Sequence, residues 1–246
     1  MTSAIRTWIL LLLGLVCLPI QADSAQVYVI RIRSEIGNGL RVYIKHGIEE
    51  AEAANAEAII FDIDTPGGAV KAAKNIIDDI HQTADPTIAY VNNEAISAGA
   101  MISLACDQIV MRSCGTIGDS APVSLQGKEA GEKIVSYVRG KIEATAERQG
   151  RNPHIAKAMV DKKLWLVELD NGDIVSLRSD EYEKKRKTEE IVEIIASGGE
   201  VEAELLTLTT DGAIKYQLAE AVAESLDDLL DLYLVAEVDG VRQAIT

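Results

Sequence analysis

Apolar and polar positions follow strand-like and helical periods in turn along the first half of the chain. Val27–Arg33 alternates and predicts a strand, whereas Ala58–Ile63 and Thr87–Val91 are apolar runs that predict buried strands. Between these strands, Val42–Ala56 and Ala69–His81 carry apolar residues at helical spacing and predict amphipathic helices. Because apolar strands alternate with helices, the pattern predicts an α/β fold with a mainly parallel sheet.

The remainder of the chain predicts further helices and a hairpin. Residues 164–177 (LWLVELDNGDIVSL) predict a hairpin with Asn171 and Gly172 at its turn. Ser179–Ala196 is rich in charged residues and predicts a solvated helix. The other predicted helices are Ala98–Ala105, Lys133–Gln149, His154–Asp161, Thr209–Gln217 and Ser225–Tyr233, and the other predicted strands are Gln108–Met111 and Leu218–Ala223, with Ser113–Asp119 as a loop after the first of these.

Two turns of small residues follow predicted strands and are the candidates for chemistry. Asp64–Gly68 (DTPGG) follows one strand, and Ser97, Ala98 and Gly99 follow another. In a parallel sheet both turns lie at the edge where ligands bind. Ser97 at a helix start would stand beside unpaired N–H groups that favour a developing negative charge, which suits a nucleophile. The alternative is that Ser97 only caps the helix, as serine often does.

A serine nucleophile needs a base, and the sequence offers histidines and lysines. His46, His81 and His154 all fall on or near polar helix positions, so a Ser-His-Asp triad has little support. A lysine can replace histidine if burial keeps its amine neutral. Lys133 is the first candidate because it opens a helix beside apolar residues; Lys128 and Lys141 are alternatives.

The first residues have the order of a secretory signal. Arg6 precedes the apolar run Trp8–Ile20, which ends in the polar residues 21–24. We therefore expect residues 1–24 to be a signal peptide or an N-terminal anchor, and residues 25–246 to form one domain with a charged hairpin-and-helix insertion at 164–206. We therefore expect the protein to be exported to the periplasm or another extracytoplasmic compartment. If residues 1–24 are an anchor, they tether it to the membrane.

Composition excludes several classes of function. The net charge of −15 and the 4% aromatic content argue against a nucleic-acid partner, which needs a basic face and stacking platforms. The sequence has no CxxC pair and no cluster of His and Cys, so we expect neither a metal nor another cofactor. Cys106 and Cys114 are expected to be buried free thiols.

Four motifs together resemble a known family. They are DTPGGAV at Asp64–Val70, NNEAISAGAMISLACDQIVM at Asn92–Met111, GTIGDSAPV at Gly115–Val123 and ERQGRN at Glu147–Asn152. In this order they are similar to the membrane-bound ClpP-class serine proteases of the NfeD family. The segment Leu206–Leu230 is similar to the end of that family's protease domain.

The resemblance implies a ClpP/crotonase-like fold of repeated β-β-α units and assigns roles to residues. It implies that Ser97 is the nucleophile, that Lys133 is the general base of a Ser-Lys dyad, and that the N–H of Gly67 or Gly68, with that of Ala98, forms the oxyanion hole. The family carries a glycine where this chain has Gln217.

The resemblance also implies substrates and partners. They are peptides with apolar segments, a stomatin-like membrane protein and further copies of the same chain. Two alternatives to a serine endopeptidase stay open: a crotonase-type thioester enzyme, and a catalytically degenerate scaffold of the same fold.

Overall fold

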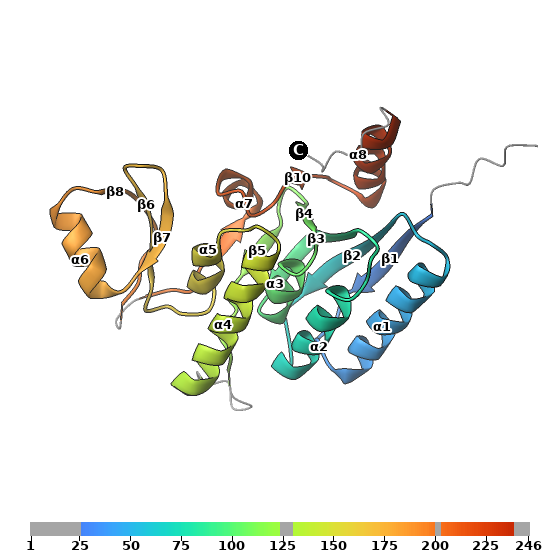
Figure 1. Ribbon diagram of the computed structural model, residues 1–246, viewed down its shortest axis with the longest axis horizontal. Helices are drawn as coiled ribbons and strands as arrows, with labels where there is room; N and C mark the ends of the chain where they lie inside the picture. Colours follow the sequence, from blue (N-terminus) through green and yellow to red (C-terminus); the bar gives the residue numbers. More distant parts are fainter. Residues whose placement is uncertain (1–25, 124–129, 200–202, 239–246) are drawn as a thin grey trace, which may run out of the picture.

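The core is a seven-stranded sheet whose strands are mainly parallel, as the apolar pattern predicted. The computed structural model describes residues 26–123, 130–199 and 203–238. The main path of the sheet has the order β1-β2-β3-β4-β10 (Figure 1). These strands are β1 Val27–Ile32, β2 Ala58–Thr65, β3 Thr87–Ile96, β4 Gln108–Met111 and β10 Ala221–Val222.

β3 is long enough to pair with two different strands on one side. Its first half pairs with β4, and its last residues, Glu94–Ile96, pair in parallel with β5 (Thr116–Gly118). β5 in turn pairs in the antiparallel sense with β9 (Thr207–Thr209). β5 lies in the segment expected to be a loop, and β10 is shorter than the expected strand. The sheet therefore stays paired up to the residue before Ser97.

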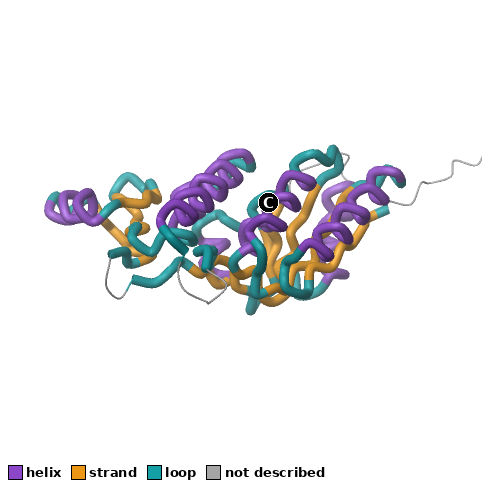
Figure 2. The backbone as a smooth tube through the Cα atoms, turned by 90° about the horizontal axis from the view of Figure 1, so that it is seen from below, coloured by secondary structure: helices purple, strands orange, loops and turns teal. Residues whose placement is uncertain are grey.

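Helices cover the two faces of the sheet unequally. α1 (Asn38–Ala53), α2 (Val70–Ile80) and α3 (Ala98–Ser103) lie on one face, where their apolar residues pack against Ile59, Phe61 and Ile63 of β2. α8 (Leu226–Val238) lies on the other, where Leu229 packs against Ile60. Figures 1 and 2 show these helices on the two faces of the sheet. Because successive strand residues point to opposite faces, β2 is apolar on both.

The predicted hairpin is confirmed, but it belongs to a second, three-stranded sheet. β6 (Trp165–Leu169) pairs with β7 (Ile174–Leu177) on one side and with β8 (Ile191–Ala196) on the other. α6 (Ser179–Lys187) covers it, and Tyr182 of α6 stacks on Trp165 with ring centroids 3.9 Å apart. Figures 1 and 2 place this sheet at one end of the molecule.

The prediction of one helix over Ser179–Ala196 was therefore wrong in its second half. α6 ends at Lys187, and Glu189 adopts a left-handed conformation with φ of 56° that turns the chain. The following residues, IVEIIA, are mostly β-branched and pair with β6. The prediction extended the charged helix too far, because the charged residues before Ile191 outweighed the β-branched residues that favour a strand.

Helices α4 (Glu132–Arg148) and α5 (Pro153–Ala158), in the middle of the chain, connect the core to the three-stranded sheet. They pack together, and α5 contacts β7. α7 (Thr210–Lys215) follows β9 directly. No helix among the described residues is both long and apolar enough to span a membrane.

Candidate active site

Ser97 occupies a strained turn between β3 and α3. Its φ of 58° and ψ of −117° are unusual for a residue with a side chain. The backbone around it is held firmly: the Ser97 N–H donates to the carbonyl of Gly118 over 2.9 Å, and the Ser97 carbonyl accepts from the hydroxyl of Ser120 over 3.1 Å. A strained strand-to-helix turn of this kind presents a serine hydroxyl away from the helix.

The alternative that Ser97 caps α3 is not supported by its geometry. The side chain of Ser97 makes no capping hydrogen bond to the helix. The residue is half-buried, whereas Ala98 and Gly99 behind it are buried. A side chain at Gly99 would lie 2.7 Å from the methyl group of Thr65, so α3 needs a small residue there to start so close to β2.

The DTPGG turn lies directly against Ser97, as the sequence predicted for two turns at one sheet edge. A Cβ at Gly67 would lie 2.5 Å from the Cβ of Ser97 and 3.0 Å from its Oγ. Gly67 and Gly68 also have positive φ values of 107° and 154°. Only glycine satisfies both the conformation and the close approach.

Ile36 pins this turn from the opposite side. The Ile36 N–H donates to the carbonyl of Gly67, and the Ile36 carbonyl accepts from the N–H of Ala69, both over 2.7 Å. In such a parallel bridge the N–H of the middle residue, Gly68, is turned away from Ile36. The N–H of Gly67 instead donates to Thr65 Oγ1 over 3.1 Å.

Three N–H groups were expected at an oxyanion hole, those of Gly67, Gly68 and Ala98, and they differ in how they are bonded. Ala98 is the first residue of α3, so its N–H has no acceptor within the helix. The N–H of Gly67, the other candidate, is engaged with Thr65 in this conformation.

Lys133 is exposed on the first turn of α4 and makes no hydrogen bond to Ser97. Of the alternative bases, Lys128 lies outside the described residues. Lys141 on the same helix pairs with Asp78 of α2 over 3.2 Å. The structure thus brings Ser97 and both glycines together, but it leaves the lysine apart.

The histidines are all placed elsewhere. His46 is exposed beside Glu49, and His81 is half-buried at the end of α2. The ring of His154 faces Ser176 of β7. A Ser-His-Asp triad at Ser97 has no support in these positions.

Sequence reasoning missed two residues of this site. Gly118 and Ser120 bind the backbone of Ser97, and Ser120 is buried. Both lie in the GTIGDS motif, so their proximity to Ser97 could have been inferred from a strand that pairs beside the end of β3. Between them, the exposed Asp119 has a positive φ of 42°.

The cysteines differ in part from expectation. Both are free, but only Cys106 is buried, and burial raises the pKa of its thiol. Cys114 is exposed, which corrects the expectation that it is buried.

No group of three or more potential metal ligands occurs among the described residues.

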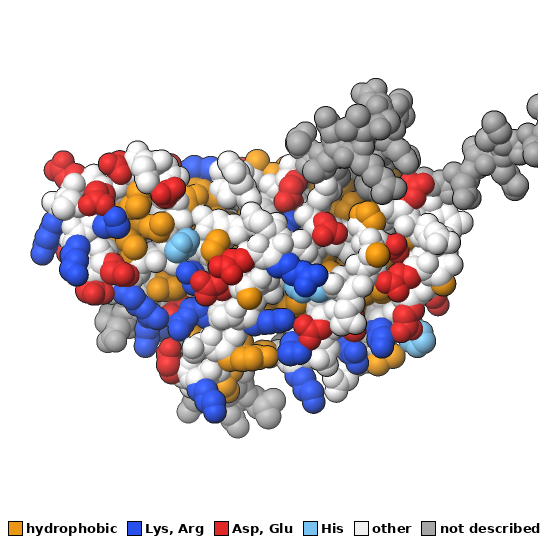
Figure 3. Space-filling model, viewed as in Figure 1, with side chains coloured by type: hydrophobic (Ala, Val, Ile, Leu, Met, Phe, Trp, Pro, Cys, Tyr) orange, Lys and Arg blue, Asp and Glu red, His pale blue; other side chains and the backbone are white. Residues whose placement is uncertain are grey.

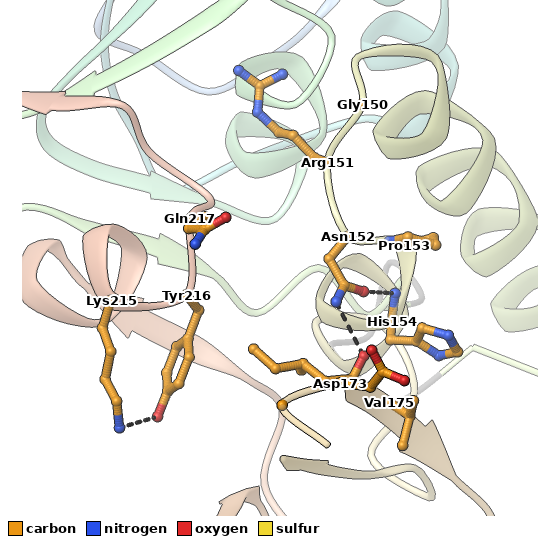
Figure 4. A pocket seen from close by; sticks show the side chains of 12 residues that line it. Gly150, Arg151, Asn152, Pro153, His154, Asp173, Val175, Lys215, Tyr216 and Gln217 are labelled. Carbon is orange, nitrogen blue, oxygen red and sulfur yellow. Dashed lines mark hydrogen bonds between the residues drawn. The ribbon is translucent and has the colours of Figure 1, made fainter. Parts of the chain in front are cut away.

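A pocket of about 660 Å³ lies away from Ser97. It is bounded by the junction of α4 and α5, the β6–β7 turn and the end of α7, with Tyr216 on one side and Asn152 and Asp173 on the other (Figure 4). Its lining contains none of the residues expected to act in catalysis. The pocket is thus bordered both by helices α4, α5 and α7 and by the β6–β7 turn of the three-stranded sheet.

Comparison with known proteins identifies the family. The family model described as the NfeD1b N-terminal domain matches residues 26–197. The chain belongs to the NfeD1b family. The membrane protein NfeD1b of Bacillus subtilis is 38% identical over 175 residues, which are 70% of this chain and 40% of that protein. The membrane-bound protease PH1510 of Pyrococcus horikoshii is 38% identical over 157 residues, 61% of this chain and 35% of that protein.

Solved structures agree with this assignment and with the fold. The 1510-N membrane-bound stomatin-specific protease, as a lysine-to-alanine mutant in complex with a substrate peptide, has a TM-score of 0.64 at 29% identity and covers 85% of this chain and 80% of its own. A serine-to-alanine mutant of the same protease has a TM-score of 0.63. ClpP1 from Listeria monocytogenes shares the fold at 15% identity, with a TM-score of 0.54. The chain spans less than half the length of these two curated relatives, NfeD1b and PH1510.

Proposed function

We propose that this NfeD1b-family chain is an exported, membrane-associated serine endopeptidase with Ser97 as nucleophile and Lys133 as general base. The observation that carries the proposal is the strained turn at Ser97 with Gly67 directly against it. The related 1510-N protease was solved as a serine mutant and as a lysine mutant with a peptide bound, which supports a serine and a lysine as the acting groups.

The proposed chemistry is acyl transfer. Ser97 Oγ attacks the peptide carbonyl and its proton passes to the Lys133 amine, while the N–H groups of Gly68 and Ala98 receive the oxyanion. The amine then protonates the leaving peptide nitrogen. Water, deprotonated by the same amine, releases the acyl group from Ser97.

Lys133 needs different surroundings before it can act as a base. A lysine acts as a general base when desolvation or a neighbouring positive charge favours its neutral amine. The proposal therefore requires a bound substrate or a neighbouring copy of the chain to cover Lys133 or to bring a positive charge to it. Apo geometry does not exclude such a base, because catalytic hydrogen bonds often form only in the complex.

The substrates proposed are peptides with apolar segments, and a stomatin-like membrane protein is the proposed partner. The related 1510-N protease is named as stomatin-specific, and PH1510 is named as membrane-bound. The signal-like residues 1–24 support export. Acidic and basic side chains are interspersed over the face in Figure 3, which gives no reason to propose a nucleic-acid partner.

The test is cleavage of an unfolded, apolar-rich protein by the purified full chain. We expect Ser97→Ala to lower the rate by at least about 10³-fold and Lys133→Ala by about 10²–10⁴-fold. Lys141→Ala is the matched control, since it removes a lysine from the same helix that pairs with Asp78. An unchanged rate for Ser97→Ala would disprove the proposal.

The exposure of Lys133 favours a second candidate, a scaffold that binds peptides without cleaving them. This function predicts that the chain binds an apolar peptide but forms no acyl-enzyme. Mass spectrometry after incubation with an activated peptide ester separates the two: a mass increase on Ser97 supports the protease, and binding without that increase supports the scaffold.

A further inference from the structure

One buried side chain, that of Thr65, contacts both turns of the candidate site. Thr65 is the last residue of β2 and is fully buried. Its hydroxyl accepts the N–H of Gly67 in the DTPGG turn over 3.1 Å. Its methyl group lies against the turn at Ser97, where a Cβ on Gly99 would stand 2.7 Å from it. A change in this side chain therefore reaches both halves of the site.

The hydroxyl of Thr65 is used both as a donor and as an acceptor. It donates to the carbonyl of Ser34 over 2.8 Å, in the segment that follows β1. The carbonyl of Gly67 is farther away, at 3.5 Å, so Ser34 is the better acceptor of the proton. With the proton turned toward Ser34, the lone pairs of the oxygen are left for the N–H of Gly67.

These bonds give the two glycine amides of the turn different surroundings. The N–H of Gly67 is bound by Thr65, and the carbonyl of Gly67 accepts from the N–H of Ile36 over 2.7 Å. The next carbonyl contact of the bridge runs from the N–H of Ala69 to Ile36. The N–H of Gly68 donates to no residue in the part of the chain that the structure describes. Gly68 therefore carries the glycine amide that is left for a ligand.

We propose that Thr65 is a positioning residue for the cleavage reaction, whose hydroxyl holds the N–H of Gly67 so that Gly68 supplies the glycine N–H to the oxyanion. The inference rests on the proposed function, because it concerns the same acyl transfer. Thr65 touches neither the peptide nor the reacting atoms, and it acts on the rate through the backbone of the turn.

A turn of two glycines needs a restraint of this kind. Glycine populates positive and negative φ about equally, so Gly67 and Gly68 do not fix the turn by themselves. Ile36 holds the peptide group between them and, because the carbonyl and N–H of a trans peptide are opposed, points the N–H of Gly68 away from itself. Thr65 holds the preceding peptide group, between Pro66 and Gly67. An oxyanion donor has to be in place before the charge develops.

Two substitutions separate the hydroxyl of Thr65 from its methyl group. Thr65→Val keeps a methyl group beside Gly99 and removes the hydroxyl, whereas Thr65→Ser keeps the hydroxyl and removes the methyl group. The measurement is cleavage of the unfolded, apolar-rich protein by the full chain, with kcat and KM determined separately. We expect Thr65→Val to lower kcat by about 10–10²-fold at unchanged KM, and Thr65→Ser to restore most of it.

Thr87→Val is the matched control, because Thr87 is another buried threonine of the same sheet with a hydroxyl bound on both sides. Its hydroxyl donates to the carboxylate of Asp107 over 2.8 Å and accepts the N–H of Asp107 over 3.0 Å. Thr87 begins β3, at the opposite end of this strand from Ser97. We expect Thr87→Val to lower the thermal unfolding midpoint about as much as Thr65→Val does and to leave kcat unchanged.

Three kinetic results would overturn the proposal. An equal loss of kcat in Thr87→Val would show that weakening of the sheet sets the rate. A Thr65→Ser chain as slow as Thr65→Val would assign the effect to the methyl group. A higher KM at unchanged kcat would place Thr65 in peptide binding.

Amide hydrogen exchange gives a readout that does not depend on cleavage. We expect the N–H of Gly67 to exchange at least about 10-fold faster in Thr65→Val than in the wild type, with protection retained in Thr65→Ser. Unchanged protection in Thr65→Val would overturn the proposal. Wild-type kcat in Thr65→Val would also overturn it while leaving the protease intact, whereas a wild-type chain that cleaves nothing would contradict the proposed function and the role of Thr65 in it.

Discussion

Gly67 is the residue that most directly limits the space around Ser97. Gly67→Ala would place a methyl group 2.5 Å from the Cβ of Ser97, at a φ of 107° that side chains rarely adopt. We expect a loss of about 1–3 kcal/mol in the free energy of unfolding and loss of any cleavage that depends on Ser97.

Urea unfolding and the cleavage assay measure these two effects. Gly140→Ala is the control, because nothing lies within 4 Å of a Cβ at that exposed position of α4. It should stabilise the protein by about 0.5–1 kcal/mol through its better helix propensity. Equal effects of the two substitutions would contradict the close approach of Gly67 to Ser97.

Gln217 occupies a conformation that glycine adopts more easily. It follows α7 with a φ of 55°, in the position where helices often end in a left-handed glycine. We expect Gln217→Gly to raise the free energy of unfolding by up to about 1 kcal/mol. The midpoint of thermal unfolding measures it, and a clear decrease would show that the Gln217 side chain makes a contact that offsets the strain.

At the scale of elements, His154 docks the insertion on α5 in a pH-dependent way. Its Nδ1 accepts the N–H of Ser176, which requires an unprotonated nitrogen. Burial, and then the charge of Lys157, lower the pKa of His154, against the opposing effect of Glu143. Because the unfolded chain binds the proton more readily, stability is greatest above about pH 6.5 and decreases as the pH falls below it.

His154→Asn should remove part of this pH dependence, since the amide oxygen accepts the same N–H without titrating. Urea unfolding at pH 7.5 and pH 5.5 compares the two chains. His46→Asn is the control for a histidine replacement at an exposed position, since His46 lies on α1 and outside the contact between α5 and β7. His81 keeps a share of the slope, since burial lowers its pKa as well.

The elements of the core could be predicted because their apolar pattern is strong. Ala58–Ile63 is apolar over its whole length, since both faces of β2 are covered, and few other structures suit such a run. The strand β8 could not be predicted in the same way, because it follows a charged helix. Its partner β6 is also not its neighbour in the sequence, since β7 and α6 lie between them along the chain. Local composition carries no information on that pairing.

Those parts of the candidate site that depend on the local backbone, the two turns, could be predicted from the sequence. Glycine and other small residues indicate the DTPGG turn and the turn at Ser97 in the sequence. The parallel sheet then brings the two turns together at one edge. The position of Lys133 depends on how the long helix α4 approaches the core, which its own residues do not determine. Exposure of a lysine cannot be read from its neighbours in the sequence alone.

At the scale of the whole molecule, Arg151 ties distant segments together. Its buried guanidinium donates to the carbonyls of Cys106 and Leu218 and pairs with Glu220. We expect Arg151→Met to lower the free energy of unfolding by about 3 kcal/mol, because it leaves these acceptors unpaired.

Chemical unfolding measures the effect of Arg151→Met. Arg148→Met is the matched control, since Arg148 is exposed three residues earlier and donates to the carbonyl of His81. It should change stability by less than about 0.5 kcal/mol. Similar losses for both substitutions would contradict the role of Arg151 as a buried tie.

The insertion leaves and re-enters the core at a single point. A Cβ on Gly198 would lie 2.4 Å from the carbonyl carbon of Leu164, and the N–H of Gly199 donates to the carbonyl of Lys162. The whole three-stranded unit between them is thus a cassette whose two ends already touch. The strands that position Ser97 all lie outside this unit, so a deletion would have to bridge only the short gap between Lys162 and Gly199.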